Sequence, residues 1–200
     1  MIAIIDYGGG NTGSVKNALD CLKLGSKITS DPADITKADR IILPGQGRFS
    51  DVMANLKAGK LDRVIKSEIR KGKPYLGICV GLQILFDEGE EDPGTKGLGI
   101  IKGTVPRFTS QKVPQIGWND IRLMKKSRLF AGVPKSAFFY FVHSYYALPE
   151  DSSLISAMTG YGIEFASAVE KDNIYAVQFH PEKSGEDGLR LLKNFGDIRC

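Results

Sequence analysis

The chain has 200 residues, which is enough for a full hydrophobic core, and we expect residues 1–200 to form a single domain. Its composition, with 42% hydrophobic and 25% charged residues, is typical of an ordinary globular protein. The net charge of +4 is modest and no basic run is long, so the sequence does not indicate a nucleic-acid partner.

The N-terminal segment and the cysteines predict the cellular setting. Residues 1–6 are typical of a buried strand rather than of a signal peptide. No apolar run approaches the ~18 residues that a membrane helix needs. The three cysteines, Cys21, Cys79 and Cys200, cannot all pair within one chain, and their spacing matches no metal motif. We therefore expect a protein of the reducing cytoplasm that has no membrane segment, metal ion or cofactor.

The first half of the chain alternates strand and helix patterns. Apolar runs predict strands over residues 1–7, 40–43 and 75–78. Apolar spacing and glycine positions predict helices over residues 14–24, 49–70 (broken near Gly59) and 80–86. This alternation predicts a mostly parallel sheet that helices cover on both faces.

The second half has a different pattern, with short β-rich runs between glycine-rich turns. These runs cover residues 99–105, 115–123, 137–143, 154–158, 165–170 and 173–179, and a last helix is expected over 187–195. Their close spacing predicts antiparallel pairing at one side of the sheet. The acidic segment 88–96 contains a proline and a glycine and is interpreted as an exposed loop.

Cys79 lies in the most informative segment of the chain. Gly77 and Gly81 stand two positions on either side of it, between a predicted strand and a predicted helix. This is the thiol version of the Gly-x-Ser-x-Gly nucleophile elbow, whose tight turn favours glycine at the flanking positions. The start of a helix also favours the thiolate. The pattern predicts an enzyme with Cys79 as its nucleophile.

A cysteine nucleophile needs a base, and the chain has only two histidines. His180 follows a predicted strand, and Glu182 stands two residues further on. In an extended segment these side chains project to the same side, so the carboxylate can orient the imidazole as in a catalytic triad. His143 ends an aromatic strand and is the alternative base, although a packed role is more common there.

An oxyanion hole is the third requirement, and two turns can supply it. The Val80 amide follows the nucleophile directly, and the turn Gly45-Gln46-Gly47 follows another strand. Both turns should emerge at the carboxyl edge of the sheet, together with Cys79 and His180. Glycine lets the backbone approach a substrate closely, so this turn can present a second donor.

One motif favours a different function. Residues 8–13 satisfy Gly-x-Gly-x-x-Gly after the first strand, and Asp31 falls near the place of a ribose-binding acid. Four glycines in six positions make an accidental match easy, and Asp31 stands in Ser30-Asp31-Pro32, where it fits the start of a turn. A nucleotide-binding module remains an alternative that would leave the elbow unexplained.

The elbow, Gln83 and His180-Pro181-Glu182 together resemble the class I (triad) glutamine amidotransferase family. Further segments are similar to those of the glutaminase subunits of imidazole glycerol phosphate synthases. They are DYG at 6–8, PGQGRF at 44–49, GICVGLQ at 77–83, PQIGWN at 114–119, HSYY at 143–146 and QFHPEKS at 178–184, in order over nearly the whole chain.

The resemblance implies a flavodoxin-like three-layer α/β sandwich and hydrolysis of glutamine to glutamate and ammonia through a thioester on Cys79. It implies that His180 is the base and acid and that Glu182 orients it. The resemblance also predicts the residues that line the glutamine pocket or oxyanion hole: Gly47, Val80, Gln83, Ser144 and Tyr145. The ammonia would pass to a cyclase partner, a (β/α)₈ barrel, for histidine synthesis. A paralogous barrel of a sugar-modifying pathway and another cysteine hydrolase, such as a peptidase, are the alternatives.

Overall fold

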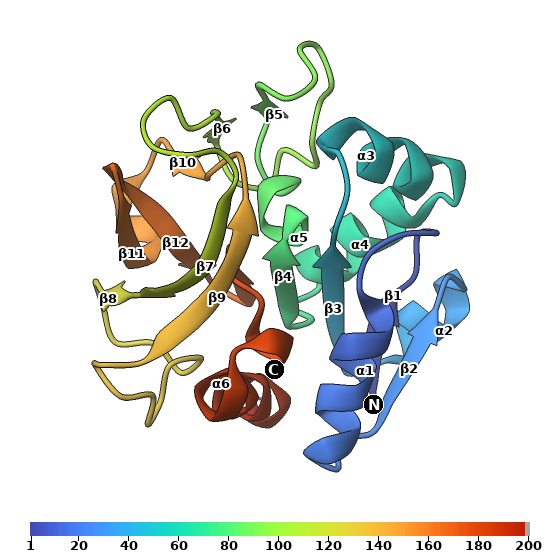
Figure 1. Cartoon of the computed structure of the whole chain (residues 1–200). Helices are drawn as coiled ribbons and strands as arrows, with labels where there is room; N and C mark the ends of the chain where they lie inside the picture. Colours follow the sequence, from blue (N-terminus) through green and yellow to red (C-terminus); the bar gives the residue numbers. More distant parts are fainter. Residues whose placement is uncertain (199–200) are drawn as a thin grey trace.

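The computed structural model describes residues 1–198, and its central feature is an eight-stranded sheet (Figure 1). The strand order is β2-β1-β3-β4-β13-β12-β11-β8. Neighbouring strands from β2 to β13 are parallel, and those from β13 to β8 are antiparallel. The predicted mostly parallel sheet with an antiparallel extension from the second half is therefore confirmed.

The predicted strands and helices lie close to their expected positions, and the structure adds elements that the sequence patterns did not predict, among them α2, β5 and β10. The strands are β1 (Ile2–Ile5), β2 (Ser26–Thr29), β3 (Arg40–Gly45), β4 (Tyr75–Cys79), β5 (Glu88–Gly89), β6 (Gly103–Val105), β7 (Gln115–Asp120), β8 (Arg122–Leu123), β9 (Phe138–His143), β10 (Leu148–Pro149), β11 (Ile155–Tyr161), β12 (Ile163–Lys171) and β13 (Ile174–Val177). The helices are α1 (Thr12–Cys21), α2 (Pro32–Lys37), α3 (Phe49–Ala58), α4 (Leu61–Arg70), α5 (Val80–Gln83) and α6 (Gly185–Asp197), with 3₁₀ turns η1 (Ser152–Leu154) and η2 (Pro181–Lys183).

Helices cover both faces of the parallel part of the sheet. Helices α1 and α6 contact each other on one face, and α2, α3 and α4 pack together on the other (Figure 1). Every residue of β1 and β4 is buried, as expected for strands with two covered faces. In α4, Leu61, Ile65 and Ile69 are buried at helical spacing, so one apolar stripe faces the sheet.

The second half differs from the expectation in one respect, because not all of its strands join the main sheet. Strands β7 and β9 form a separate antiparallel pair, and β10, β6 and β5 form a small sheet of three strands. The run 115–123 is divided between β7, which pairs with β9, and β8, which pairs with β11. One continuous β-rich segment thus connects two sheets, and periodicity alone does not reveal that division.

The helix after the elbow is shorter than predicted. Helix α5 ends at Gln83, and the amides of Leu85 and Phe86 bond to carbonyls three residues back. The carbonyls of Ile84 and Leu85 instead accept from amides of residues 98, 100 and 101. A distant segment therefore takes the acceptors that a longer helix would use.

The glycine-rich turn at residues 8–13 packs against the sheet edge. A Cβ on Gly10 would lie 3.0 Å from the Tyr7 hydroxyl oxygen and 3.2 Å from the Pro44 carbonyl oxygen. Asp31 caps α2, because its Oδ1 accepts from the Ala33 amide at 2.8 Å. Asp31 therefore starts a helical turn, as its sequence context indicates. Its side chain caps α2, which argues against the ribose-binding role that the nucleotide hypothesis needs. Among residues 1–198, no helix is long and apolar enough to span a membrane.

Candidate active site

Cys79 forms a strained turn between β4 and α5. Its backbone has φ 55° and ψ −110°, in the region that residues other than glycine rarely adopt. The neighbouring chain leaves no room for side chains beside it. A Cβ on Gly77 would lie 2.3 Å from the Gly81 carbonyl oxygen, and one on Gly81 would lie 2.0 Å from the Leu43 carbonyl oxygen. The predicted nucleophile elbow is present, and its two glycines are sterically required.

The register of the sheet brings three strand ends together at this turn. Gly45 pairs with Cys79 across β3 and β4, and Val177 pairs with Ile78 across β13 and β4. All three strands are parallel, so the residues that follow them emerge at one edge, where α5 begins (Figure 1). His180 stands three residues past the end of β13 and reaches the same edge as Cys79.

His180 and Glu182 form the predicted contact. The imidazole Nδ1 lies 2.9 Å from Glu182 Oε1, and both side chains are only 1% exposed. The ring is held further by its backbone, since the His180 amide bonds to the Tyr140 carbonyl oxygen at 2.9 Å. The other ring nitrogen, Nε2, is buried and has no hydrogen-bond partner among residues 1–198. Nε2 is therefore free to exchange a proton with the thiol or with a bound substrate.

The charge state of His180 follows from competing effects. Burial alone would lower its pKa, but the neighbouring Cys79 and Glu182 outweigh burial and raise the pKa of His180 to about 10. A protonated imidazole next to Cys79 stabilises the thiolate, which is the nucleophilic form. The buried carboxylate of Glu182 stabilises the imidazolium in turn. The arrangement can therefore perform nucleophilic attack and general acid–base chemistry.

His143 lies in the same cavity but in a different electrostatic setting. Its Nδ1 is 2.7 Å from the Tyr145 carbonyl oxygen, and its ring packs against Phe108, Phe141 and Phe165. Burial lowers the pKa of His143 to about 4, although the bond to the Tyr145 carbonyl opposes that shift. Among residues 1–198, no carboxylate bonds to the His143 ring as Glu182 bonds to His180. The ring is therefore neutral with its proton on Nδ1, a structural role rather than that of the base.

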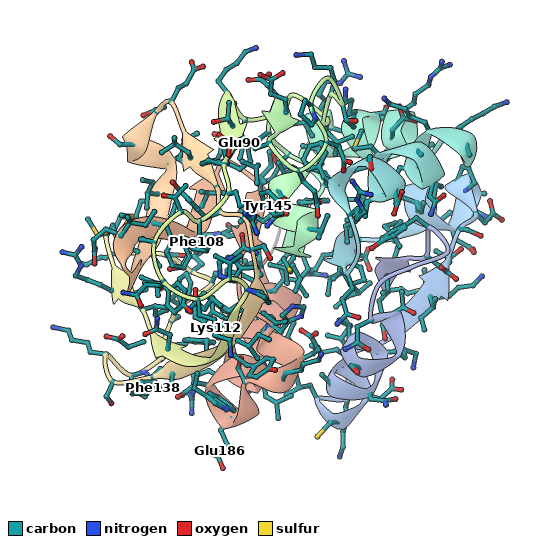
Figure 2. All side chains as sticks on the ribbon, turned by 45° about the horizontal axis from the view of Figure 1, so that its top comes forward. Glu90, Phe108, Lys112, Phe138, Tyr145 and Glu186 are labelled. Carbon is teal, nitrogen blue, oxygen red and sulfur yellow. The ribbon has the colours of Figure 1, made fainter. Side chains whose placement is uncertain are left out.

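A cavity of about 360 Å³ opens over Cys79. Most of the residues predicted for the site line it. The lining residues are Gln46, Gly47, Cys79, Val80, Gln83, Glu91, Pro114, Val142, His143, Ser144, Tyr145 and His180. Figure 2, which looks onto this edge of the sheet, shows Tyr145 near the centre of the molecule. Two predicted residues do not line the cavity: Glu182 lies behind His180, and Gly45 is buried where a Cβ would lie 2.6 Å from Val80 Cβ.

The two expected oxyanion turns meet beside the sulfur. The Val80 amide opens α5 and so has no partner one turn back in its own helix. The Gln46 amide lies 3.4 Å from the Tyr7 hydroxyl oxygen, which in turn lies 3.4 Å from the Gln46 carbonyl oxygen. The Tyr7 hydroxyl is thus within hydrogen-bond distance of both the amide and the carbonyl oxygen of Gln46, and Gln46 and Gly47 are the two residues of this turn that border the cavity.

Glu91 is a cavity residue that the sequence analysis missed. The prediction that segment 88–96 is an exposed loop is wrong for Glu88 and Gly89, which form β5, and for Glu91 and Asp92, which are half-buried. Glu91 Oε2 accepts from the Phe49 amide at 2.8 Å, and Asp92 accepts from the Ser50 amide and pairs with Arg48. Both carboxylates therefore cap the start of α3, where the helix dipole favours negative charge. These contacts join residues more than forty positions apart in the chain, so no local sequence pattern predicts them.

Comparisons with known proteins show the family of the chain. The model of the family "Glutamine amidotransferase class-I" matches residues 3–198. The chain is 51% identical to imidazole glycerol phosphate synthase subunit HisH of Thermococcus kodakarensis, covering 98% of each chain. It is 48% identical to the same subunit of Moorella thermoacetica, covering 98% of this chain and 94% of that one.

Solved structures show the same fold at lower identity. PurLQS from Thermotoga maritima superposes with a TM-score of 0.75 at 22% identity, covering 97% of this chain and 96% of that one. The match to the family model and the near-complete coverage of similar relatives together show the family of this chain. The chain belongs to the class I glutamine amidotransferases and, within them, to the family of imidazole glycerol phosphate synthase HisH subunits.

Proposed function

We propose that Cys79, His180 and Glu182 hydrolyse the side-chain amide of glutamine and that the ammonia passes to a cyclase subunit for histidine biosynthesis. One observation carries the proposal: a strained cysteine at a strand–helix turn shares a cavity with a buried, carboxylate-paired histidine. The relatives described above are named as subunits of imidazole glycerol phosphate synthase, which favours the cyclase over other partners.

The proposed reaction has two halves. In the first half, Cys79 Sγ attacks the amide carbon, and the negative charge on the oxygen is held by the Val80 amide and a second amide from the turn at Gly47. The carbon–nitrogen bond then breaks as His180 Nε2 donates a proton to the nitrogen, so that ammonia leaves and a thioester remains. In the second half, His180 takes a proton from water, the hydroxide attacks the thioester, and glutamate and the Cys79 thiolate are released.

The cavity also suits the amino-acid end of the substrate. Glu91 places a carboxylate at the cavity wall, where it can pair with the α-ammonium group of glutamine. Ser144 and Tyr145 also line the cavity, and they can bond to the α-carboxylate of glutamine through their backbone or hydroxyl groups. A small cavity with a carboxylate in its wall favours a free amino acid as substrate over a peptide, because a peptidase needs an extended groove.

The outer face of the β7–β9 pair is the proposed docking surface for the cyclase, a (β/α)₈ barrel. Ile116, Trp118 and Phe138 are 63%, 56% and 52% exposed on this face, while the alternate residues of β9 point inward and are buried. Figure 2 shows Phe138 at the periphery of the molecule. The face continues into the cavity through Pro114 and Val142, so a partner seated there would cover the exit for ammonia.

The test is glutamine hydrolysis and labelling of the cysteine in the assembled complex. A glutamine-mimicking diazoketone should alkylate Cys79 and leave Cys21, which is exposed on α1, unmodified. Hydrolysis should increase when the cyclase barrel and its ligand are added. Folded, partner-bound protein whose Cys79 stays unlabelled, or which turns over peptides but not glutamine, would refute the proposal.

A further inference from the structure

A line of buried polar groups runs from His143 to the sulfur of Cys79. The Tyr145 carbonyl oxygen lies 2.7 Å from His143 Nδ1 and 3.1 Å from Gln83 Nε2. The same Nε2 lies 3.1 Å from Gln178 Oε1, and Gln178 Nε2 lies 3.6 Å from Cys79 Sγ. Gln178 is fully buried and Gln83 is 5% exposed, so water cannot readily replace these bonds.

The order of donors and acceptors in this line follows from the Tyr145 carbonyl. A backbone carbonyl can only accept, so Gln83 must turn its NH₂ group, not its oxygen, toward Tyr145. That NH₂ group also faces Gln178, which must therefore present its oxygen to Gln83. The NH₂ group of Gln178 is left facing the sulfur. The Tyr145 carbonyl thus determines, through two amides, that the sulfur meets a donor.

Strand geometry explains why Gln178 reaches the sulfur at all. Gln178 and His180 stand two residues apart directly after β13, so they project to the same side. One segment therefore carries both the base and this amide to Cys79. The proposed triad gives His180 a catalytic role, but it gives no role to Gln178.

We propose that Gln178 donates a hydrogen bond to the Cys79 thiolate and stabilises it, and that Gln83, which bonds to the Tyr145 carbonyl, is a positioning residue that holds Gln178 in this orientation. The inference rests on the proposed role of Cys79 as the nucleophile. An N–H donor stabilises the thiolate more than the thiol, because hydrogen bonds to charged groups are the stronger ones. Gln178 thereby complements His180, which projects toward Cys79 from the same segment after β13.

The test measures the rate of Cys79 alkylation by iodoacetamide against pH, with each cysteine peptide resolved by mass spectrometry. This reagent does not need the glutamine site, so substrate binding does not enter the result. Gln178→Met keeps the length of the side chain and removes the donor. We expect the midpoint of the profile to rise by about one pH unit, which slows alkylation about tenfold below the midpoint.

A double-mutant cycle tests the positioning role. Gln83→Met should raise the midpoint as well, because Gln178 then loses the partner that orients it. In the Gln178→Met background, Gln83→Met should have no additional effect. The matched control is Gln115→Met, a buried glutamine at 3% exposure that does not contact the sulfur, and its midpoint should equal that of the unmodified protein.

The outcomes separate the inference from the proposed function. An unchanged midpoint in folded Gln178→Met protein, or fully additive shifts in the cycle, would overturn the inference alone. Wild-type Cys79 that reacts no faster than Cys21 would overturn the proposed nucleophile and the inference together. If Gln178→Met does not fold, Gln178→Ala removes the donor without adding a charge beside the sulfur, and its midpoint must still rise.

Discussion

His180 Nδ1 and Glu182 Oε1 lie 2.9 Å apart, and the two residues are separated by a single proline. The contact is almost completely buried, which strengthens the interaction between the carboxylate and the charged ring. Burial would otherwise leave the ring neutral, as it does for His143. The different environments of the two histidines favour His180 over His143 as the proposed base, and the first predictions test that proposal.

Glu182→Gln removes the charge that stabilises the imidazolium and keeps the shape of the side chain. We expect turnover of glutamine to fall by a factor on the order of 10³–10⁴ while the KM changes little. Steady-state kinetics of the complex with glutamine measure this effect. Activity within a few-fold of the unmodified enzyme would exclude Glu182 from the triad.

The same substitution should change how stability depends on pH. The pKa of His180 is raised to about 10, above the usual value of 6.5, so the folded state holds the proton over a range in which the unfolded state has lost it. This contribution to stability is complete below about pH 6.5 and is lost as the pH rises toward 10. Denaturant unfolding across this window should show a decline in the unmodified protein and a flatter curve in Glu182→Gln.

Cys79→Ser should abolish glutamine hydrolysis and leave ammonia-driven synthesis by the complex intact. The hydroxyl is a much weaker nucleophile, and we expect a loss of about 10⁵-fold or more in glutamine-dependent turnover. Comparing the two nitrogen sources in one assay separates the glutaminase from the cyclase. Cys21→Ser is the control and should retain both activities, because Cys21 is exposed on α1. Loss of the ammonia-driven reaction in Cys79→Ser would point to a broken complex instead.

Gly81→Ala should distort the elbow. The added Cβ would lie 2.0 Å from the Leu43 carbonyl oxygen, so the backbone must shift. We expect a loss of about 1–3 kcal/mol or more in the free energy of unfolding, together with loss of Cys79 alkylation. Gly13→Ala is the matched control: Gly13 lies in the first turn of α1 with open space around it, so alanine there should not lower the free energy of unfolding. Equal effects at the two glycines would contradict the steric explanation.

Trp118→Ala tests the docking surface. Trp118 is 56% exposed at the middle of the β7–β9 face, where its ring meets Tyr140 edge-on. An aromatic residue at the centre of an interface commonly contributes about 2 kcal/mol, so the Kd for the cyclase should rise roughly 30-fold. Calorimetric titration measures the affinity. Leu148→Ala is the control, an exposed residue on β10 whose loss should leave the Kd unchanged.

Local sterics and short-range spacing allowed the sequence alone to predict the elbow at Cys79 and the contact between His180 and Glu182, both of which the structure shows. Gly77 and Gly81 must be glycine because backbone atoms of the same turn and of its neighbour strand occupy the space of a Cβ. His180 and Glu182 meet because residues two apart in an extended segment share a side. The parallel sheet follows likewise from alternating apolar runs and helical spacing, which are properties of consecutive residues.

Only the tertiary structure decided which distant groups surround the reactive sulfur. Glu91 lines the cavity while it caps α3, the Tyr7 hydroxyl lies next to the Gln46 amide and carbonyl, and Gln83 bonds to Gln178 across a separation of 95 positions. Strands β7 and β9 leave the main sheet and so expose an apolar face. Such contacts depend on how whole elements pack, and a chain read residue by residue carries no local signal of them.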